Sequence, residues 1–204
     1  MQNIEPHFSW RDEYIASEDR RSPFYRREYS EFEYTNSIYN YCIHPQWDDF
    51  GSSTLYVKIL YTDYKTGFTV IEMIGEWNDA INNDVALFKR EIIDKQIELG
   101  VNKFILIGEN VLNFHGSDDC YYEDWFRELN GNVNGTGEGW ISMINFRSHV
   151  LVEMKQYNVD AYVKLGEEWN DINWRTYKPQ DMLAVIENRF DKELPSHHAS
   201  DSAV

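Results

Sequence analysis

The chain has 204 residues, 42% of them hydrophobic, which is enough for one domain with a substantial core. It carries 35 Asp and Glu residues against 19 Lys and Arg, giving a formal net charge of -16 and a pI near 4.7. Nucleic acids and anionic membranes are therefore disfavoured as partners, because both would be repelled, whereas cations and basic partners are favoured.

The two cysteines, Cys42 and Cys120, have neither the spacing of a disulfide framework nor that of a zinc site. The N-terminus lacks the basic and apolar regions of a secretory signal, and the sequence contains no apolar run near the ~18 residues of a membrane span. We therefore expect a cytoplasmic protein without a membrane segment. The sequence also lacks the phosphate-binding fingerprints of a nucleotide site, so no cofactor is predicted.

Residues 1–35 are polar, charged and aromatic without a helix or strand period, which predicts an N-terminal arm or long loop. The arm has two arginine pairs, Arg20-Arg21 and Arg26-Arg27, that can form bidentate contacts with carboxylates of the acidic body. We favour an arm that packs on its own domain. The alternative is an arm that mediates homo-oligomer formation or binds a partner.

Residues 36–193 are predicted to form a single α/β domain. Residues 54–61 alternate enough to form a half-buried strand, and a short connection ending in Gly67 leads to a second apolar run that starts at Phe68. Two strands joined in this way predict an antiparallel hairpin.

The rhythm then changes to strand, helix, strand, which makes the flanking strands parallel. The expected helices cover residues 85–99, 121–129 and 148–157, with a last helix that has Pro179 in its first turn; the expected strands cover residues 103–109, 140–146 and 161–165. Residues 130–139 are rich in Gly and Asn, which predicts a surface loop, and residues 194–204 form a flexible C-terminal tail. The fold class is therefore α/β, a mostly parallel sheet of about four βα units preceded by an antiparallel hairpin, with helices on both faces.

Three of the expected strands end in Gly-Glu, at Glu76, Glu109 and Glu167. If these strands are parallel, the glutamates lie at the carboxyl edge of one sheet, where ligands bind in open α/β folds. With Asp79, Asp171 or Asp118 nearby, they offer the oxygen ligands that Mg²⁺ or Ca²⁺ prefers. An alternative is that each glutamate lies just before a helix N-terminus, which favours a negative side chain, and we prefer this structural interpretation.

The loop after the strand at residues 103–109 holds His115, Ser117, Asp118 and Cys120 within six residues. His115 is the candidate general base. Sequence neighbours rarely form a catalytic group, because catalytic partners usually come from separate elements. We therefore favour a loop whose Ser and Asp side chains cap the next helix.

The strand, helix, strand order with a Ser/Asp loop between Gly108 and Cys120 resembles STAS-type regulatory domains. The resemblance rests on element order and implies binding to partner proteins with a serine switch. No signature sequence of that family is present, so Ser117 is not assigned as the switch.

Our leading interpretation is a non-catalytic protein-binding or regulatory module that acts through an acidic edge and aromatic loops. The competing interpretation is a divalent-metal-dependent hydrolase or transferase acting on a small anionic substrate. In that enzyme Glu76, Glu109, Glu167 and Asp118 would bind the metal and His115 would act as the base.

Overall fold

A computed structural model describes residues 4–30, 32–131 and 139–193, which divide into two compact units, Met1–Ile172 and Asn173–Val204. The strands of the first unit are β1 (Ser37–Ile38), β2 (Tyr41–Cys42), β3 (Leu55–Asp63), β4 (Phe68–Asn78), β5 (Lys103–His115) and β6 (Trp140–Ile144). Its helices are α1 (Asp84–Phe88), the π-helical η1 (Lys89–Ile93), α2 (Asp94–Ile97), α3 (Cys120–Gly131), α4 (Ser148–Gln156) and the 3-10 helices η2 (Val159–Ala161) and η3 (Glu167–Trp169).

The second unit contains η4 (Trp174–Thr176) and α5 (Pro179–Glu193), so the last helix begins at the proline that the sequence indicated. The sequence predicted an arm over residues 1–35, a single domain over residues 36–193 and a tail over residues 194–204. Most of the predicted surface loop and the whole predicted tail lie outside the described residues.

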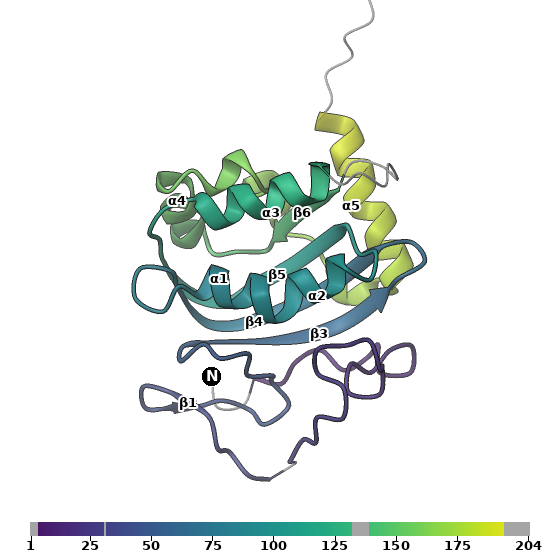
Figure 1. The fold of residues 1–204 in the computed structure, drawn as a ribbon, viewed down its shortest axis with the longest axis vertical. Coiled ribbons are helices and arrows are strands. Elements are labelled where there is room, and N and C mark those ends of the chain that lie inside the picture. Colours follow the sequence, from purple (N-terminus) through teal and green to yellow (C-terminus); the bar gives the residue numbers. More distant parts are fainter. Residues whose placement is uncertain (1–3, 31, 132–138, 194–204) are drawn as a thin grey trace, which may run out of the picture. The chain divides into compact units, whose positions relative to one another are not determined.

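The sheet of the first unit has the strand order β3-β4-β5-β6 (Figure 1). β3 and β4 form the antiparallel hairpin, while β4, β5 and β6 are mutually parallel. The predicted combination of an antiparallel hairpin with a mostly parallel sheet is confirmed. It arises because a short connection joins β3 to β4, whereas helical crossovers join β4 to β5 and β5 to β6.

The crossover helices pack with one face of the sheet. Val85, Phe88 and Trp125 belong to the same apolar cluster as the alternate strand residues Met73 and Leu106. Strands that follow one another in sequence order, each joined by a right-handed crossover, place successive crossover helices on the same side.

The opposite face of β3 and β4 carries Tyr56 and Ile74. These side chains pack against Ile38, Ile43 and Trp47 from the β1–β2 hairpin and the segment after it. Helices were predicted on both faces. In this unit, an irregular N-terminal segment covers this part of the second face instead.

The fourth parallel strand predicted at residues 161–165 is reduced to one isolated bridge between Ser142 and Lys164. Met143 N donates to Lys164 O, and Lys164 N donates to Ile141 O, each at 2.8 Å. The pairing stops there because η2 occupies the preceding residues and Gly166, with φ 142°, turns the backbone immediately afterwards. The prediction of a full fourth strand was therefore wrong.

The N-terminal arm packs on its own unit. Trp10, Ala16 and Phe24 are buried, and the indole Nε1 of Trp47 donates to Ile4 O at 2.8 Å. This arrangement agrees with the interpretation that we favoured for the arm.

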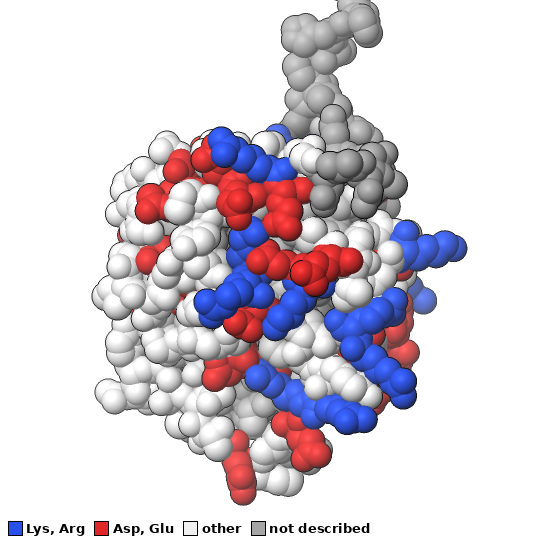
Figure 2. Space-filling model, viewed as in Figure 1, with Lys and Arg blue, Asp and Glu red and all other residues white. Residues whose placement is uncertain are grey.

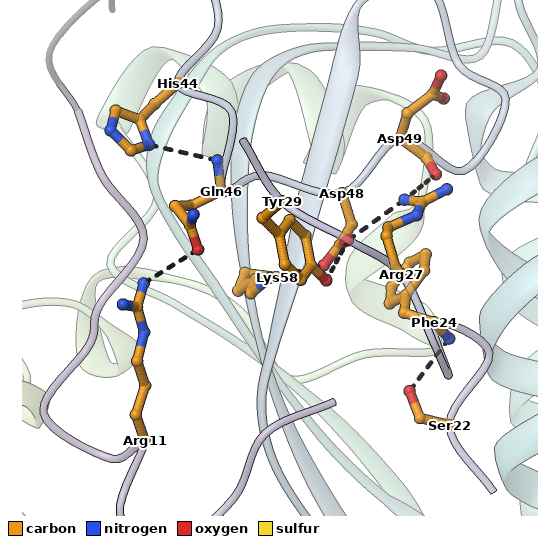
Figure 3. A network of polar contacts seen from close by, with 10 residues as sticks. All are labelled: Arg11, Ser22, Phe24, Arg27, Tyr29, His44, Gln46, Asp48, Asp49 and Lys58. Carbon is orange, nitrogen blue, oxygen red and sulfur yellow. Dashed lines mark hydrogen bonds and ion pairs between the residues drawn. The ribbon is translucent and has the colours of Figure 1, made fainter. Parts of the chain in front are cut away.

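Asp48 is the main polar anchor of the arm (Figure 3). Its carboxylate is fully buried and accepts hydrogen bonds from Tyr29 Oη at 2.6 Å and Arg27 Nη1 at 3.2 Å. Lys58 Nζ of β3 lies 3.1 Å from the other carboxylate oxygen, and burial lowers the pKa of this lysine. Asp48 also pairs through its backbone with Val57, so one residue connects the arm, the edge strand and two cations.

Replacing Asp48 with Asn is expected to destabilise the protein by about 3 kcal/mol, because Lys58 and Arg27 would lose the carboxylate that balances their charges. Urea unfolding of the wild type, Asp48→Asn and the exposed arm control Asp12→Asn measures the effect. A loss no larger than that of the control would contradict the anchoring role.

Candidate functional site

The loop after β4 and the end of β5 lie side by side at the carboxyl edge of the sheet. Asn78 pairs with His115, whose carbonyl oxygen accepts hydrogen bonds from Asp79 N at 2.8 Å and Ala80 N at 3.0 Å. The β4–α1 loop is therefore held against the end of β5.

The segment before β3 joins the same edge through Thr54. Thr54 O accepts a hydrogen bond from Glu76 N at 2.8 Å, and Thr54 Oγ1 accepts one from Asn82 Nδ2 at 3.1 Å. A Cβ atom on Gly75, where φ is +118°, would lie 2.1 Å from Thr54 O and 2.6 Å from Ile38 Cδ1. Glycine is required at this position, because any side chain would separate the β1–β2 hairpin and Thr54 from β4.

Four segments thus meet at this edge: residues 36–42, 53–54, 80–83 and 113–115. None of them contains Asp, Glu, Lys or Arg, although 26% of the whole chain is charged. We call this surface the neutral edge. Figure 2 shows few charged side chains on the left of the view, where β1 and the start of α1 lie in Figure 1. The acidic edge expected from the sequence is therefore not what these segments present.

The neutral edge exposes large apolar and aromatic side chains. Ile81 is 83% exposed, Tyr39 71% and Tyr41 57%. Tyr39 stands at the turn of the β1–β2 hairpin with φ 52°, a conformation that bulky residues rarely adopt. Its hydroxyl donates to Glu76 Oε2 at 2.8 Å, which fixes the side chain while its ring stays exposed to solvent.

The first of the predicted glutamates, Glu76, lies directly behind this surface. It is only 9% exposed and accepts hydrogen bonds from Tyr39 Oη and from Asn113 Nδ2, the latter at 3.0 Å. The carboxylate is thus satisfied by neutral donors of the neutral edge.

The other predicted ligands have separate surroundings. Glu109 Oε1 accepts a hydrogen bond from Asn145 Nδ2 at 2.9 Å, Glu167 begins η3, and Asp118 Oδ1 accepts one from Cys120 N at 3.2 Å. Within the described ranges, no three or more His, Cys, Asp or Glu residues form a group that could hold a metal ion. The metal site stays a prediction of the sequence without a corresponding cluster in the described residues.

A β-bulge explains part of this separation. Between Ile107 and Asn110, β5 has one residue more than the facing stretch of β4 from Glu72 to Ile74. An extra residue reverses the alternation of side chains along the strand, so Gly-Glu endings in two neighbouring strands need not face each other.

His115 is exposed, and its contacts with the β4–α1 loop come from its backbone oxygen. In the described part of the chain, neither the His115 ring nor the Ser117 hydroxyl bonds to another titratable side chain. The Cys120 thiol donates a hydrogen bond to Asp118, which raises the pKa of the thiol to about 11. A thiol with so high a pKa is a poor nucleophile at neutral pH.

Two further carboxylates, Asp79 and Asp84, are buried behind the neutral edge at 4% and 0% exposure. Asp79 accepts hydrogen bonds from Trp77 Nε1, Tyr122 Oη and Val85 N at 2.8–2.9 Å, while Asp84 Oδ2 accepts one from Asn78 N at 2.7 Å. Burial raises the pKa of both carboxyls, that of Asp79 to about 6. From the sequence, the Asp residues of this loop were candidate helix caps, and Asp79 was also a carboxylate near the proposed cation site; the sequence carries no signal of their burial.

The raised pKa of Asp79 predicts a pH dependence of stability. The folded-state pKa of about 6 exceeds the ordinary value of 3.8. The contribution of Asp79 to the unfolding free energy is therefore fully present below pH 3.8 and is lost as the pH rises through 6. Asp79→Asn removes this titration. The unfolding free energy of the variant relative to the wild type should therefore rise by about 2 kcal/mol between pH 4 and pH 6, out of about 3 kcal/mol over the whole titration.

Urea unfolding at several pH values measures this difference. The control Asp160→Asn removes an exposed carboxylate in η2 and reports the general effect of losing one surface charge. Parallel curves for the wild type and Asp79→Asn across the pH range would contradict the assignment.

None of the helices in residues 4–30, 32–131 and 139–193 has the length and apolar character needed to cross a membrane. Neither a protein-family model nor a curated protein matches the sequence. Among solved structures, the chain is similar to a Thermotoga maritima protein described as a candidate anti-sigma factor antagonist. The two share 16% sequence identity at a TM-score of 0.40, over 64% of this chain and 92% of the other. A likeness at this level carries no argument about function.

Proposed function

We propose that this protein is a non-catalytic binding protein that recognises another protein through the neutral edge. The observation that supports this proposal is the placement of exposed Ile81, Tyr39 and Tyr41 on a charge-free surface of a chain with a net charge of -16. On the rest of the described surface, charged side chains are common at exposed positions.

The composition of the neutral edge resembles that of protein interfaces. The centres of such interfaces are depleted in charged residues and enriched in tyrosine, and the largest single contributions often come from aromatic anchors. Asn and Ser side chains such as Asn40, Asn82 and Ser53 add adaptable hydrogen bonds at low conformational cost.

The arm is a weaker candidate for the interaction surface. Trp10 and Phe24 are buried in the first unit, and Arg27 is engaged by Asp48. Phe8 and Phe32 are 60% and 86% exposed, but Phe32 stands between Glu31 and Glu33 in the sequence, so the arm does not offer an uncharged surface there. We therefore place partner binding on the neutral edge and not on a homo-oligomer formed through the arm.

A test of the proposed function begins with affinity capture from cell extract on immobilised wild-type protein. Captured proteins are identified by mass spectrometry, purified and titrated calorimetrically against the wild type and Ile81→Asp. We expect the substitution to weaken binding at least about tenfold, because it places a charge at the centre of an apolar contact.

The matched control is Val152→Asp on α4, which puts the same charge at another aliphatic residue that is 56% exposed. Binding should survive this change. If both variants bind the partner as tightly as the wild type, the neutral edge is not the binding surface.

The competing metal-dependent enzyme predicts a different result. An ion that binds only the folded state must raise the thermal midpoint. We expect no change in midpoint with millimolar Mg²⁺, Mn²⁺ or Ca²⁺, measured by differential scanning calorimetry. A rise that Glu109→Gln abolishes would instead establish a cation site and contradict our proposal.

A further inference from the structure

Three carboxylates lie behind the neutral edge, those of Glu76, Asp79 and Asp84, and the described part of the chain places no cation beside them. Within the described residues, no Lys, Arg or His nitrogen lies within 4.0 Å of any of the three. Their hydrogen bonds come from Tyr, Trp and Asn side chains and from backbone amides. The surface in front of them is uncharged.

The same chain treats another buried carboxylate differently. Asp48 has both Arg27 and Lys58 within 3.2 Å. Two cations of the chain therefore balance the charge of Asp48. The carboxylates behind the neutral edge receive hydrogen bonds only from uncharged groups. Charges with low-dielectric surroundings act over longer distances than charges in water, so these carboxylates make the adjoining neutral surface attractive to a cation.

Glu76 is the most exposed of the three residues, and its two carboxylate oxygens accept hydrogen bonds from Tyr39 and Asn113. It is 9% exposed, and it lies below Tyr39, whose ring is mostly accessible. A tyrosine ring binds a cation on its face. The chain already uses such contacts, since Lys58 Nζ lies 3.6 Å from the ring centre of Tyr29 and the Arg21 guanidinium lies 3.8 Å from that of Tyr64.

We infer that the partner presents a basic side chain that lies against the Tyr39 ring and pairs with Glu76, flanked by apolar residues that contact Ile81 and Tyr41. This inference rests on the proposed function and specifies the chemistry of the partner. It also explains the arrangement of the surface, in which uncharged side chains of the neutral edge surround the negatively charged Glu76. Tyr39 and Glu76 then determine specificity, while Ile81 supplies apolar contact.

Two blocked peptides provide the test. Acetyl-Leu-Arg-Leu-amide carries the cation, and acetyl-Leu-citrulline-Leu-amide is its neutral isostere. Each is titrated into the ¹⁵N-labelled full-length chain while the amide shifts of residues 39, 76 and 81 are followed. We expect the arginine peptide to bind at least about tenfold more tightly than the citrulline peptide.

Glu76→Gln should abolish this preference, because glutamine keeps the size of the side chain but not its charge. Its amide oxygen can still accept one of the two hydrogen bonds that Glu76 receives from Tyr39 and Asn113, while the other is lost. The control Glu98→Gln removes an exposed carboxylate at the end of α2 and should leave the preference intact. Should Glu76→Gln fold poorly, Tyr39→Ala serves instead. This residue is 71% exposed, so its truncation spares the core, and it should lower the preference several-fold.

Equal affinity for the two peptides, or a preference that survives both substitutions, would overturn the inference. This failure is distinguishable from failure of the proposed function. A partner whose binding is lost in Ile81→Asp but is insensitive to Glu76→Gln would leave the binding surface in place and refute only its preference for a basic side chain.

Discussion

The structure of the first unit depends on how the polar side chains of β4 are satisfied. All eleven residues of this strand are buried, and they include Glu72, Glu76 and Asn78. Buried polar groups require hydrogen-bond partners, and three different segments supply them. His7 N of the arm donates to Glu72 at 2.8 Å, Tyr39 Oη of the hairpin donates to Glu76, and Ile81 N of the following loop donates to Asn78 Oδ1 at 3.0 Å. The segments that cover the sheet and build the neutral edge are thus positioned by the central strand itself.

Periodicity predicted the strands and crossovers well, because apolar alternation and glycine-containing connections are local signals. The hairpin of β3 and β4, the helical run that ends before Gly100 and the helix that starts at Pro179 all follow from such signals. The fourth parallel strand was overpredicted. Residues 161–165 satisfy a strand pattern, but the flanking η2 and Gly166 leave space for one bridge only. The length of a strand depends on the backbone conformation of the residues on either side, and hydrophobic periodicity does not predict that conformation.

The sequence predicted candidate ligands at the carboxyl edge of the sheet, but it did not predict the burial of Glu76 or the uncharged surface in front of it. The neutral edge at the carboxyl end of the strands exposes Tyr39 and Tyr41, while other exposed rings, such as those of Phe8 and Phe32, belong to the arm. Glu76 was predicted as a metal ligand; in the structure it is 9% exposed, and its carboxylate accepts hydrogen bonds from Tyr39 and Asn113. Net charge could not reveal this, because it does not distinguish buried carboxylates from exposed ones. The available signal was the absence of charged residues from 36–42 and 80–83, two stretches that become neighbours only in the fold.

The division between a neutral edge and a strongly anionic remainder also governs the colloidal behaviour of the protein. At neutral pH, mutual repulsion between chains of charge -16 keeps exposed Ile81 and Tyr41 of different molecules apart. Near the isoelectric point of about 4.7 this repulsion vanishes, while the neutral edge keeps its apolar character. Acidification is therefore expected to favour self-association through the neutral edge, because the acidic residues elsewhere no longer supply the repulsion that keeps the molecules apart.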